Sequence, residues 1–600
     1  MKPRITLGIS GFANSVGQEG WGHDPAAAVV KDGRLVAAAA EERFIRVKWA
    51  LGRFPENAVR FCLREAGVTL DEVDAVGWSN NPPLASTRWA EANGRAFVKK
   101  GLLGAVRRSR NVAGGALSRL VRPDLRPWET VETQEAELRS RFRLGEAPPF
   151  WAFDHHLCHA ASSFYTSGFE SSAIVTWDGS GDALSGLVAR GRGPDIEVMR
   201  TFADFSVGEL YWNIHKLLRL SDEGSLMGLA AYGAAQPLFA EVADPERLWM
   251  DMNQIRAIEG WVRTRKTLSP FVRSLGEPRL PDDPLTTHHK DLAASLQAVI
   301  ERFGFKMVEM ALAMTSERRL CMAGGCSLNA VFNGKLTRSG MVDDLFIHPA
   351  PSDDGGAVGA AFLAHRQVGG VPRVEALRTA ALGPSYDDDA TDAILANVGL
   401  AADRLTDEEV VAATAEALGE GKIVGWFQGR MEWGPRALGS RSILADPRDT
   451  ASRDRVNRVV KYRDAWRPFA PSMLAEAAEE YLVQPHDAPF MLTTFQVSDA
   501  GKRDIPAAVH ADETTRPQIV DETHVPRYHA LIAEFGRRTG VPAVLNTSFN
   551  LKGEPIVCSP IDALRTFVSS GLDVLVLGNR VIRKSGFGEA TVMEEAGLYA

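Results

Sequence analysis

The sequence lacks long hydrophobic runs and paired cysteines. No apolar stretch approaches the roughly 18 uncharged residues that a membrane-spanning helix needs. The N-terminus has only a short apolar run after residues 1–4 and is predicted to be a first strand rather than a signal peptide, which makes a cytoplasmic location the expectation. The five cysteines are widely spaced without a CxxC pair, and this pattern indicates neither a disulfide framework nor a zinc–cysteine site. The cysteines are Cys62, Cys158, Cys321, Cys326 and Cys558.

A strong charge of either sign is also missing. The net charge is −8 over 600 residues, which argues against nucleic acid as a partner. Residues 88–126 depart from this balance, because they contain many basic residues and only Glu91 and Asp124 as acids. This segment is interpreted either as a solvated, partly helical excursion or as a lid or docking surface for an anionic acceptor or partner. Its basic residues are Arg88, Arg95, Lys99, Lys100, Arg107, Arg108, Arg110, Arg119, Arg122 and Arg126.

The length exceeds what one hydrophobic core usually supports, so two or more domains are expected. In the first half, short apolar runs alternate with helical patterns, which is typical of an α/β protein. Residues 5–11 and 26–30 are predicted strands, and Lys31-Asp32-Gly33 is a predicted hairpin turn into residues 35–39. A strand–turn–strand start of this kind opens each half of the actin- and Hsp70-like ATPase fold.

A domain boundary is predicted at residues 367–389, where glycine, proline and aspartate accumulate and periodicity is weak. Residues 1–366 would form the first domain, and residues 390–600 a separate α/β unit. In the first domain, further strands are predicted at 172–176 and 320–322, and a small-residue helix packed on a sheet at 353–364. In the second domain, the predicted elements are a helix at 408–418 and strands at 422–428, 541–545 and 574–577.

Two histidines have the spacing of a metal site. His155 and His159 are four residues apart, so on a helix both imidazoles lie on one face. Acidic residues occur at loop positions that suit a shared site: Asp178 follows a predicted strand, and Asp353-Asp354 precede a glycine-rich helix start. Two imidazoles with one or two carboxylates suit Fe(II), Mn(II) or Zn(II), whereas Mg(II) alone is less suited to nitrogen ligands. The alternative is that both are ordinary surface histidines.

Glycine-rich turns occur at three places in the first domain. Their backbone N–H groups can close on a phosphate, and the helix that follows one of them offers its positive end. None matches the P-loop or the GxGxxG fingerprint, and glycine turns serve any α/β fold. Three in one domain nevertheless favour a nucleotide cleft. The residues concerned are Gly179, Gly181, Gly228, Gly324, Gly325 and Asn329.

The second domain places basic side chains on glycine- and proline-rich backbone. Residues 429–441 carry arginines among glycines, and Lys461, Arg467 and Arg516 follow. Residues 546–550, Asn-Thr-Ser-Phe-Asn, leave a predicted strand and add amide and hydroxyl groups. Rigidly held arginines suit bidentate capture of phosphate or carboxylate. The segment is therefore predicted to bind two phosphorylated ligands, with structural salt bridges as the alternative.

Taken together, these blocks resemble the nodulation-type carbamoyltransferase family, which also modifies antibiotics and other natural products. The similarity runs along nearly the whole chain, with the blocks in family order. Ala231, where the family usually has proline, is a small departure, and Glu513, where a glycine is common, makes the placement of Arg516 less certain. The blocks are residues 23–24, 41–48, 54–55, 155–160, 227–233, 324–325, 352–355, 434–439, 467–471 and 546–550.

The resemblance implies an actin-like ATPase domain of two RNase H-like subdomains, followed by a YrdC-like domain. It implies that carbamoyl phosphate and ATP form carbamoyl-adenylate and pyrophosphate in the second domain. The carbamoyl group would then pass to a hydroxyl of a small-molecule natural product in the metal-bearing first domain. Neither nucleic acid nor a membrane takes part in this scheme.

The family motifs also assign roles to single residues. His155, His159, Asp178 and Asp354 would hold the ion, with Fe(II) as the first candidate, and ATP would be used with Mg(II). His23 and Lys48 would activate or position the acceptor, and Arg436 would take part in catalysis. The residues expected to bind carbamoyl phosphate and the phosphates of ATP are Arg436, Lys461, Arg467, Arg516, Ser548 and Asn550.

Two other functions remain as alternatives. A tRNA threonylcarbamoyladenosine enzyme shares both domain types, but it predicts a basic tRNA face, which the net charge of −8 and the block from His23 to Lys48 disfavour. A non-catalytic nucleotide-binding regulator would tolerate the loss of Arg436 or His155. The enzyme predicted here would not.

Overall fold

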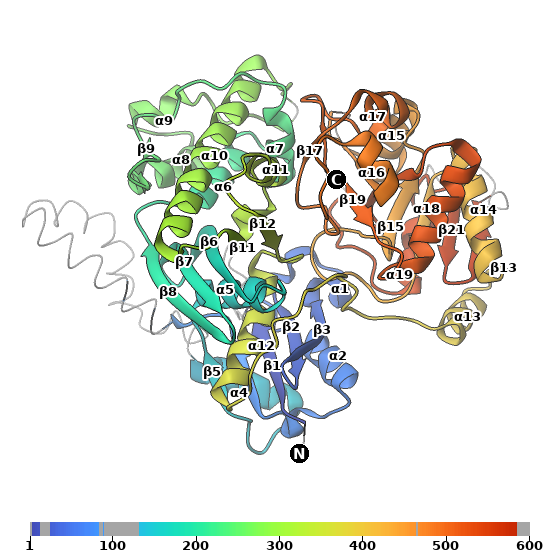
Figure 1. Cartoon of the computed structure of the whole chain (residues 1–600), viewed down its shortest axis with the longest axis horizontal. Coiled ribbons are helices and arrows are strands. Elements are labelled where there is room, and N and C mark those ends of the chain that lie inside the picture. Colours follow the sequence, from blue (N-terminus) through green and yellow to red (C-terminus); the bar gives the residue numbers. More distant parts are fainter. Residues whose placement is uncertain are drawn as a thin grey trace, which may run out of the picture.

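A computed structural model describes residues 3–11, 24–82, 84, 88, 131–281, 283–463 and 466–584. His23 and all of the basic segment except Arg88 lie outside these residues, so the roles expected of them stay predictions. The described chain forms two five-stranded sheets in its N-terminal part and an eight-stranded sheet in its C-terminal part, with two short two-stranded sheets beside them (Figure 1). Within the described ranges, each helix is too short or too polar to span a bilayer.

The first sheet has the strand order β3-β2-β1-β4-β5. Its first three strands form an antiparallel meander, and β4 and β5 join parallel to β1. The predicted hairpin turn is confirmed, because Asp32 and Gly33 both have positive φ, as a tight two-residue turn between twisted strands requires. The strands are β1 (Ile5–Ser10), β2 (Ala26–Lys31), β3 (Arg34–Ala40), β4 (Ala75–Trp78) and β5 (Phe150–Ala152).

The second sheet repeats this topology. Its order is β8-β7-β6-β11-β12, with an antiparallel meander followed by two parallel strands. Two copies of one sheet topology are what an actin-like domain of two RNase H-like subdomains contains, so the fold predicted for the N-terminal part is confirmed. The strands are β6 (Ser171–Gly181), β7 (Leu184–Arg192), β8 (Asp195–Phe202), β11 (Arg319–Ala323) and β12 (Asp344–Ile347).

Two helices, α5 (His155–Tyr165) and α12 (Gly356–Gln367), pack against each other between the two sheets (Figure 1). Helix α12 lies on β1 and α5 lies on β6. The backbones touch at two glycines. A Cβ at Gly8 would lie 1.9 Å from the carbonyl oxygen of Ala357, and a Cβ at Gly359 would lie 1.9 Å from the carbonyl oxygen of Cys158. Because no side chain fits at either position, the glycines set the spacing of sheet, α12 and α5.

Of the remaining helices of the N-terminal part, α2 packs on the first sheet and α6 and α10 pack on the second, while α7 packs on α10 and α8 on α6 (Figure 1). Their bounds are α1 (Glu41–Ile45), α2 (Glu56–Ala66), α4 (Val131–Phe142), α6 (Val207–Leu217), α7 (Glu223–Ala230), α8 (Met252–Thr264), α9 (Pro270–Ser274), α10 (Thr287–Thr315) and α11 (Ala330–Arg338).

The C-terminal sheet is mixed, with the order β13-β22-β21-β14-β15-β20-β16-β19. Strand β21 is apolar at every position because Val574 and Val576 face one hydrophobic cluster while Leu575 and Leu577 face another. The C-terminal part of the chain thus has the α/β fold expected of it, and the predicted domain bounds stay a prediction. The strands are β13 (Asp403–Arg404), β14 (Val424–Phe427), β15 (Arg441–Ala445), β16 (Ala470–Leu474), β19 (Gln518–Val520), β20 (Ala543–Ser548), β21 (Val574–Leu577) and β22 (Arg580–Arg583).

Helices cover both faces of this sheet. One cluster buries side chains of α14 and α18, and the other buries side chains of α16 and α19. Residues 368–387, which overlap the predicted boundary, form no helix or strand apart from one bridge between Ala381 and Glu432. The helices are α13 (Asp388–Asn397), α14 (Asp407–Gly419), α15 (Thr450–Val456), α16 (Ala475–Tyr481), α17 (Asp499–Asp504), α18 (Pro526–Thr539) and α19 (Pro560–Val568).

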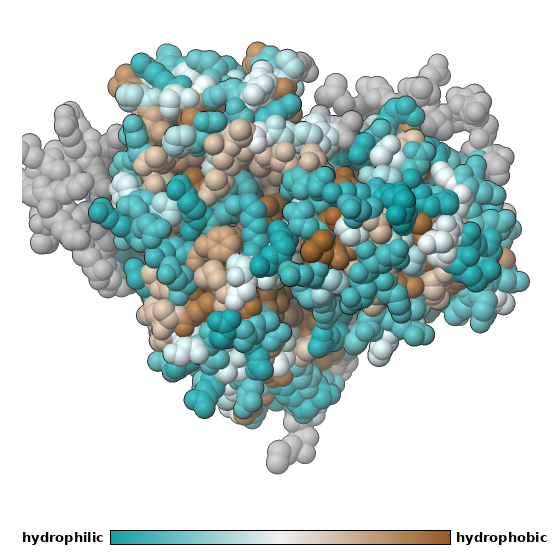
Figure 2. Space-filling view, turned by 45° about the horizontal axis from the view of Figure 1, so that its top comes forward, coloured by the Kyte–Doolittle hydropathy of each residue, from teal (hydrophilic) through white to brown (hydrophobic). Residues whose placement is uncertain are grey.

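The two parts of the chain are joined by hydrogen bonds from arginines of the N-terminal motif. Arg46 donates to the carbonyl oxygens of Ile556 and Pro555 at 2.6 and 2.8 Å, and Arg43 donates to that of Gly434 at 3.0 Å. Charged donors bound to backbone carbonyls make these contacts specific in geometry. The face of the molecule in Figure 2 is predominantly hydrophilic, and hydrophobic side chains appear on it in small groups.

Candidate metal centre and anion pocket

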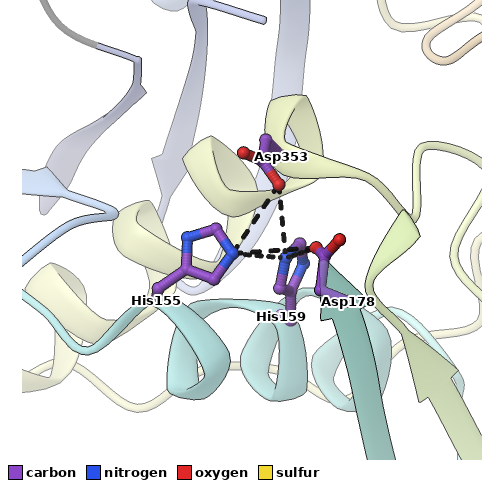
Figure 3. A group of neighbouring side chains, drawn as sticks. All are labelled: His155, His159, Asp178 and Asp353. Carbon is purple, nitrogen blue, oxygen red and sulfur yellow. Dashed lines mark hydrogen bonds and ion pairs between the residues drawn. The ribbon is translucent and has the colours of Figure 1, made fainter. Parts of the chain in front are cut away.

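Four side chains converge beside the first turns of α5, the end of β6 and the start of α12. His155 and His159 lie one turn apart on α5, Asp178 lies near the end of β6, and Asp353 lies in a 3-10 turn (Asp353–Gly355) before α12. One donor atom of each lies within 4.8 Å of the others. Figure 3 shows the two imidazole rings and the two carboxylates pointing toward one another. The helical pairing of the histidines predicted from their spacing is confirmed.

The spacing of the donor atoms suits a small divalent cation. The two imidazole Nε2 atoms are 3.1 Å apart, and His159 Nε2 lies 3.2 Å from Asp178 Oδ2. Asp353 Oδ1 lies 3.6 Å from His155 Nε2 and 3.8 Å from His159 Nε2. Ligands held about 2.1 Å from one ion are roughly 3.0 to 3.4 Å from one another, so small shifts complete a coordination shell. The residues present therefore fit a cation with nitrogen and oxygen ligands.

The electrostatics favour positive charge at this cluster. Burial alone would lower the pKa of His155, but Asp353 and Asp178 beside the ring raise it to about 9. Burial would raise the pKa of the Asp178 carboxyl, but hydrogen bonds from His155 and His159 hold it well below its usual range. Two carboxylates thus stabilise a cation at the imidazoles, whether that cation is a proton or a metal ion.

The fourth member of the cluster differs from the sequence prediction, which named Asp354. The Asp354 carboxylate instead accepts a hydrogen bond from Gly355 N at 2.9 Å. Burial, with the negative charge of Asp24 nearby, raises its pKa to about 8. In a 3-10 turn successive side chains point about 120° apart, so only one of two adjacent aspartates can face the histidines. That one is Asp353.

Glycines of the predicted loops border the same cluster. A Cβ at Gly181 would lie 2.0 Å from His155 Cδ2, and one at Gly325 would lie 3.1 Å from Asp178 Oδ1. Gly324, with φ of +90°, turns the chain there. These glycines are therefore required by the packing around the histidines and carboxylates, and nucleotide contact by the same loops stays a prediction.

Gly181→Ala is expected to destabilise the fold by roughly 1–3 kcal/mol, because the added methyl overlaps the His155 ring. The ring would be displaced from Asp178 and Asp353, so divalent metal should bind more weakly. Denaturant unfolding and metal titration measure the two effects. Gly179→Ala, on the same strand with its nearest neighbouring atom at 4.0 Å, is the matched control. Equal effects from both substitutions would contradict the argument.

Two other predicted nucleotide-loop residues lie elsewhere. Gly228 is inside α7, where a Cβ would lie 3.4 Å from the Trp466 ring, so this glycine contacts the C-terminal part of the chain. Asn329 caps α11 by accepting from Phe332 N and exchanges hydrogen bonds with Gln297. Gly228 and Asn329 therefore have packing roles.

A second polar site lies in the C-terminal part. Lys461, at the end of a π-helical turn (Asn457–Lys461), donates to Asn550 Oδ1 at 2.8 Å and to Ser548 Oγ at 3.2 Å. Ser548 ends β20, so this strand positions both acceptors. Burial and the nearby cations Arg463 and Arg467 lower the pKa of the Lys461 ammonium well below its usual range. The structure thus brings together three of the predicted phosphate-binding residues.

Three guanidinium groups influence one another electrostatically, and one of them, that of Arg467, also influences Lys461. Burial lowers the pKa of Arg516, and the charges of Arg436 and Arg467 lower it further. Burial likewise lowers the pKa of Arg436 to about 10, with Asp222 opposing and Arg467 adding to the shift. The Nε of Arg436 is buried and makes no hydrogen bond with any described residue. A bound anion would stabilise cations that repel one another, so these residues form a candidate anion site, which we call the anion pocket.

One residue of the pocket comes from the N-terminal part and was missed in the sequence. Asp222 Oδ1 lies 3.0 Å from Arg467 Nη2. The same carboxylate caps α7 by accepting from Ser225 N at 2.7 Å. The only sequence signal was that of a helix N-cap, because an aspartate precedes the helical run. Lys48 is an electrostatic neighbour of both Asp222 and Lys461, so it lies where the two parts of the chain meet.

The structure therefore has an actin-like domain with a histidine–aspartate cluster, in contact with an α/β domain that holds an anion pocket. The Carbamoyltransferase N-terminus family matches residues 15–362, and the Carbamoyltransferase C-terminus family matches residues 415–584. The chain belongs to the carbamoyltransferase family. The resemblance inferred from its motifs is confirmed.

Similar proteins support this membership along the whole length. Nodulation protein NolNO of Sinorhizobium fredii is 36% identical over 97% of this chain and 82% of its own length. Nodulation protein NolO of Bradyrhizobium diazoefficiens is 38% identical over 72% of this chain and 79% of its own length. The 3'-hydroxymethylcephem-O-carbamoyltransferase of Streptomyces clavuligerus is 30% identical over 61% of this chain and 66% of its own length.

Proposed function

We propose that the protein is an ATP- and metal-dependent O-carbamoyltransferase that acts on a hydroxyl of a small-molecule natural product. The observation that carries this proposal is the pairing of two sites in one carbamoyltransferase chain: a cationic pocket that can hold phosphate groups and a histidine–aspartate cluster in an ATPase-type domain. Each site suits one half of a two-step transfer.

The first half-reaction belongs to the anion pocket. Carbamoyl phosphate is cleaved with water to carbamate and inorganic phosphate, and a carbamate oxygen attacks the α-phosphate of ATP. Carbamoyl-adenylate forms and pyrophosphate leaves. Arg436, Arg467 and Arg516 supply the positive charge that holds the phosphates and offsets the negative charge developing on them. Lys461 is held in place by Ser548 and Asn550, so its ammonium is oriented before substrate arrives.

The second half-reaction belongs to the N-terminal domain, where the acceptor hydroxyl attacks the carbamoyl carbon and AMP leaves. A divalent ion bound by His155, His159, Asp178 and Asp353 would supply Lewis-acid charge to the adenylate phosphate. Fe(II) is our first assignment, and Mn(II) and Zn(II) suit the same donors. Burial of both histidines keeps competing water away from the cluster.

Lys48 is proposed to position the acceptor or the passing adenylate, because it lies beside charged groups of both domains. His23 keeps the role that the family motif gives it, in acceptor activation. Carbamate itself is a poor acyl donor, and its adenylate hydrolyses in water. A route between two contacting domains protects that intermediate.

The test is a mixture of the purified protein, carbamoyl phosphate and ATP, without threonine or tRNA. We expect pyrophosphate release that depends on carbamoyl phosphate. Release that requires threonine instead would indicate threonylcarbamoyl chemistry, and no release would overturn the proposal. Mass spectrometry of candidate hydroxyl compounds, monitored for a carbamoyl mass increment, then identifies the acceptor.

A further inference from the structure

The anion pocket contains a negative charge supplied by the other domain. Arg467 reaches across the domain contact to Asp222 Oδ1 at 3.0 Å, and its Nη1 donates to Ser221 Oγ at 3.0 Å. Both charged side chains are largely buried, with 17% of Arg467 and 28% of Asp222 exposed. An ion pair with this burial is weakly screened by salt and competes with other ligands for the same guanidinium.

We propose that Asp222 sets the affinity of the anion pocket by occupying Arg467 until a substrate phosphate replaces it. Capture of the phosphate and release of the Arg467–Asp222 domain contact are then a single event. This inference rests on the proposed function, since it takes the phosphate of carbamoyl phosphate as the incoming anion.

The charges around Asp222 support a competitive role. Burial would raise the pKa of Asp222, but Arg467, the hydrogen bonds from Ser225 and the charge of Lys48 hold it at about 2. The negative charge of this carboxylate also attracts Arg436. Asp222 therefore lies among the cations that an incoming phosphate must contact, and its negative charge opposes that phosphate.

The carboxylate keeps other partners when Arg467 leaves it. Its Oδ1 accepts from Ser225 N at 2.7 Å and from Ser225 Oγ at 2.9 Å, and its Oδ2 accepts from Ser221 Oγ at 3.2 Å. Because these bonds cap α7, the helix end stays satisfied without the ion pair. The Arg467 contact is thus exchangeable, as a competitor for substrate must be.

The position of α7 links this exchange to the domain contact. Besides Asp222, the helix presents Gly228 to the Trp466 ring and to Pro468, where a Cβ would lie 3.4 and 3.7 Å away. Tyr232, just after the helix, donates to the carbonyl oxygen of Trp466 at 3.3 Å. The segment that carries Arg467 is therefore held against α7 on both sides of the ion pair. Loss of the pair when phosphate binds weakens this contact.

The test is Asp222→Asn, which keeps an N-capping side chain and removes the charge. We expect the KM for carbamoyl phosphate in pyrophosphate release to fall roughly five- to fiftyfold. Inorganic phosphate, titrated by calorimetry, should bind more tightly in the same proportion. A KM and a phosphate affinity that are unchanged, or that weaken, would overturn the proposal.

Two further variants separate this effect from folding and from the proposed function. Asp222→Ser also caps the helix without a charge, and it must reproduce the tighter phosphate binding for the proposal to stand. Asp251→Asn changes the N-cap of α8, which accepts from Asn253 and Gln254, and should leave both measurements unchanged. The wild-type protein could release no pyrophosphate while Asp222→Asn still binds inorganic phosphate more tightly. The proposed function would then be wrong, and the competition between Asp222 and phosphate for Arg467 would be supported.

Discussion

Arg436→Ala should lower the rate of carbamoyl-phosphate-dependent pyrophosphate release by about 10²- to 10³-fold. This is the usual effect of losing one hydrogen-bond donor that stabilises developing negative charge in a site from which water is excluded. The side chain lies beside Arg467 and Arg516, and its buried Nε makes no hydrogen bond with the described residues. Its removal relieves the burial of a charged group and its repulsion from Arg467, and it forfeits the attraction to Asp222. The free energy of unfolding should therefore stay unchanged or rise by up to about 1 kcal/mol. Coupled pyrophosphate detection and denaturant unfolding measure the two effects.

Arg430→Ala is the matched control, because it lies in the same glycine-rich segment with a different set of partners. Arg430 donates to the carbonyl oxygens of Leu382 and Gly383 at 2.7 and 3.1 Å. Its loss should cost about 1–3 kcal/mol of stability, because the Gly383 carbonyl loses its Arg430 donor and the Leu382 carbonyl keeps only its bond from Ala38 N. The KM for carbamoyl phosphate should change little. If Arg436→Ala were destabilised while keeping most of its activity, the side chain would be structural and the anion pocket would be misassigned.

His159→Ala should separate the two half-reactions. His159 is fully buried, and its Nε2 lies within 3.8 Å of donor atoms on all three other members of the cluster. Loss of this ligand should reduce bound divalent metal at least tenfold and carbamoyl transfer about a thousandfold. Pyrophosphate release from the anion pocket should stay within about threefold of the wild type, because the first half-reaction uses other residues. Metal analysis of the purified protein and the two product assays provide the measurements.

The matched control is His156→Ala, which opens a comparable cavity in the same helix. His156 is fully buried, and its Nδ1 lies 3.0 Å from Thr176 Oγ1 rather than in the cluster. This variant should lose stability but keep its metal content and the ratio of transfer to pyrophosphate release. Equal loss of both half-reactions in His159→Ala would show that the cluster supports the whole fold rather than the transfer step.

Much of the fold can be predicted from local sequence patterns, because the residues suit the turns, strands and helices that they form. The turn at Asp32 and Gly33 needs two positive φ angles, and its residues are those that tolerate them. The β21 strand at residues 574–577 is apolar at every position because both of its faces are covered. The histidine pair on α5 follows from the helical period alone.

The parts of the two sites that the sequence did not predict depend on the direction in which a side chain points and on contacts between residues far apart in the chain. Asp353 and Asp354 are chemically equivalent neighbours, and only the 3-10 turn decides which of them faces the histidines. Asp222 is a helix cap by local pattern, and its second role arises because a residue 245 positions away, Arg467, packs beside it. Gly228 fits a loop motif but packs inside a helix at the domain contact.

The close packing of α12 has a consequence for motion. Gly359 fixes α12 against α5, which carries two of the cluster's donors, and Asp353 stands just before α12 begins. Three of the four donors are therefore attached to one tightly packed pair of helices and move as a rigid unit. If the two sheets move against each other during turnover, the distances among these three donors stay the same. Selection among ions by radius is then independent of whether the enzyme is open or closed.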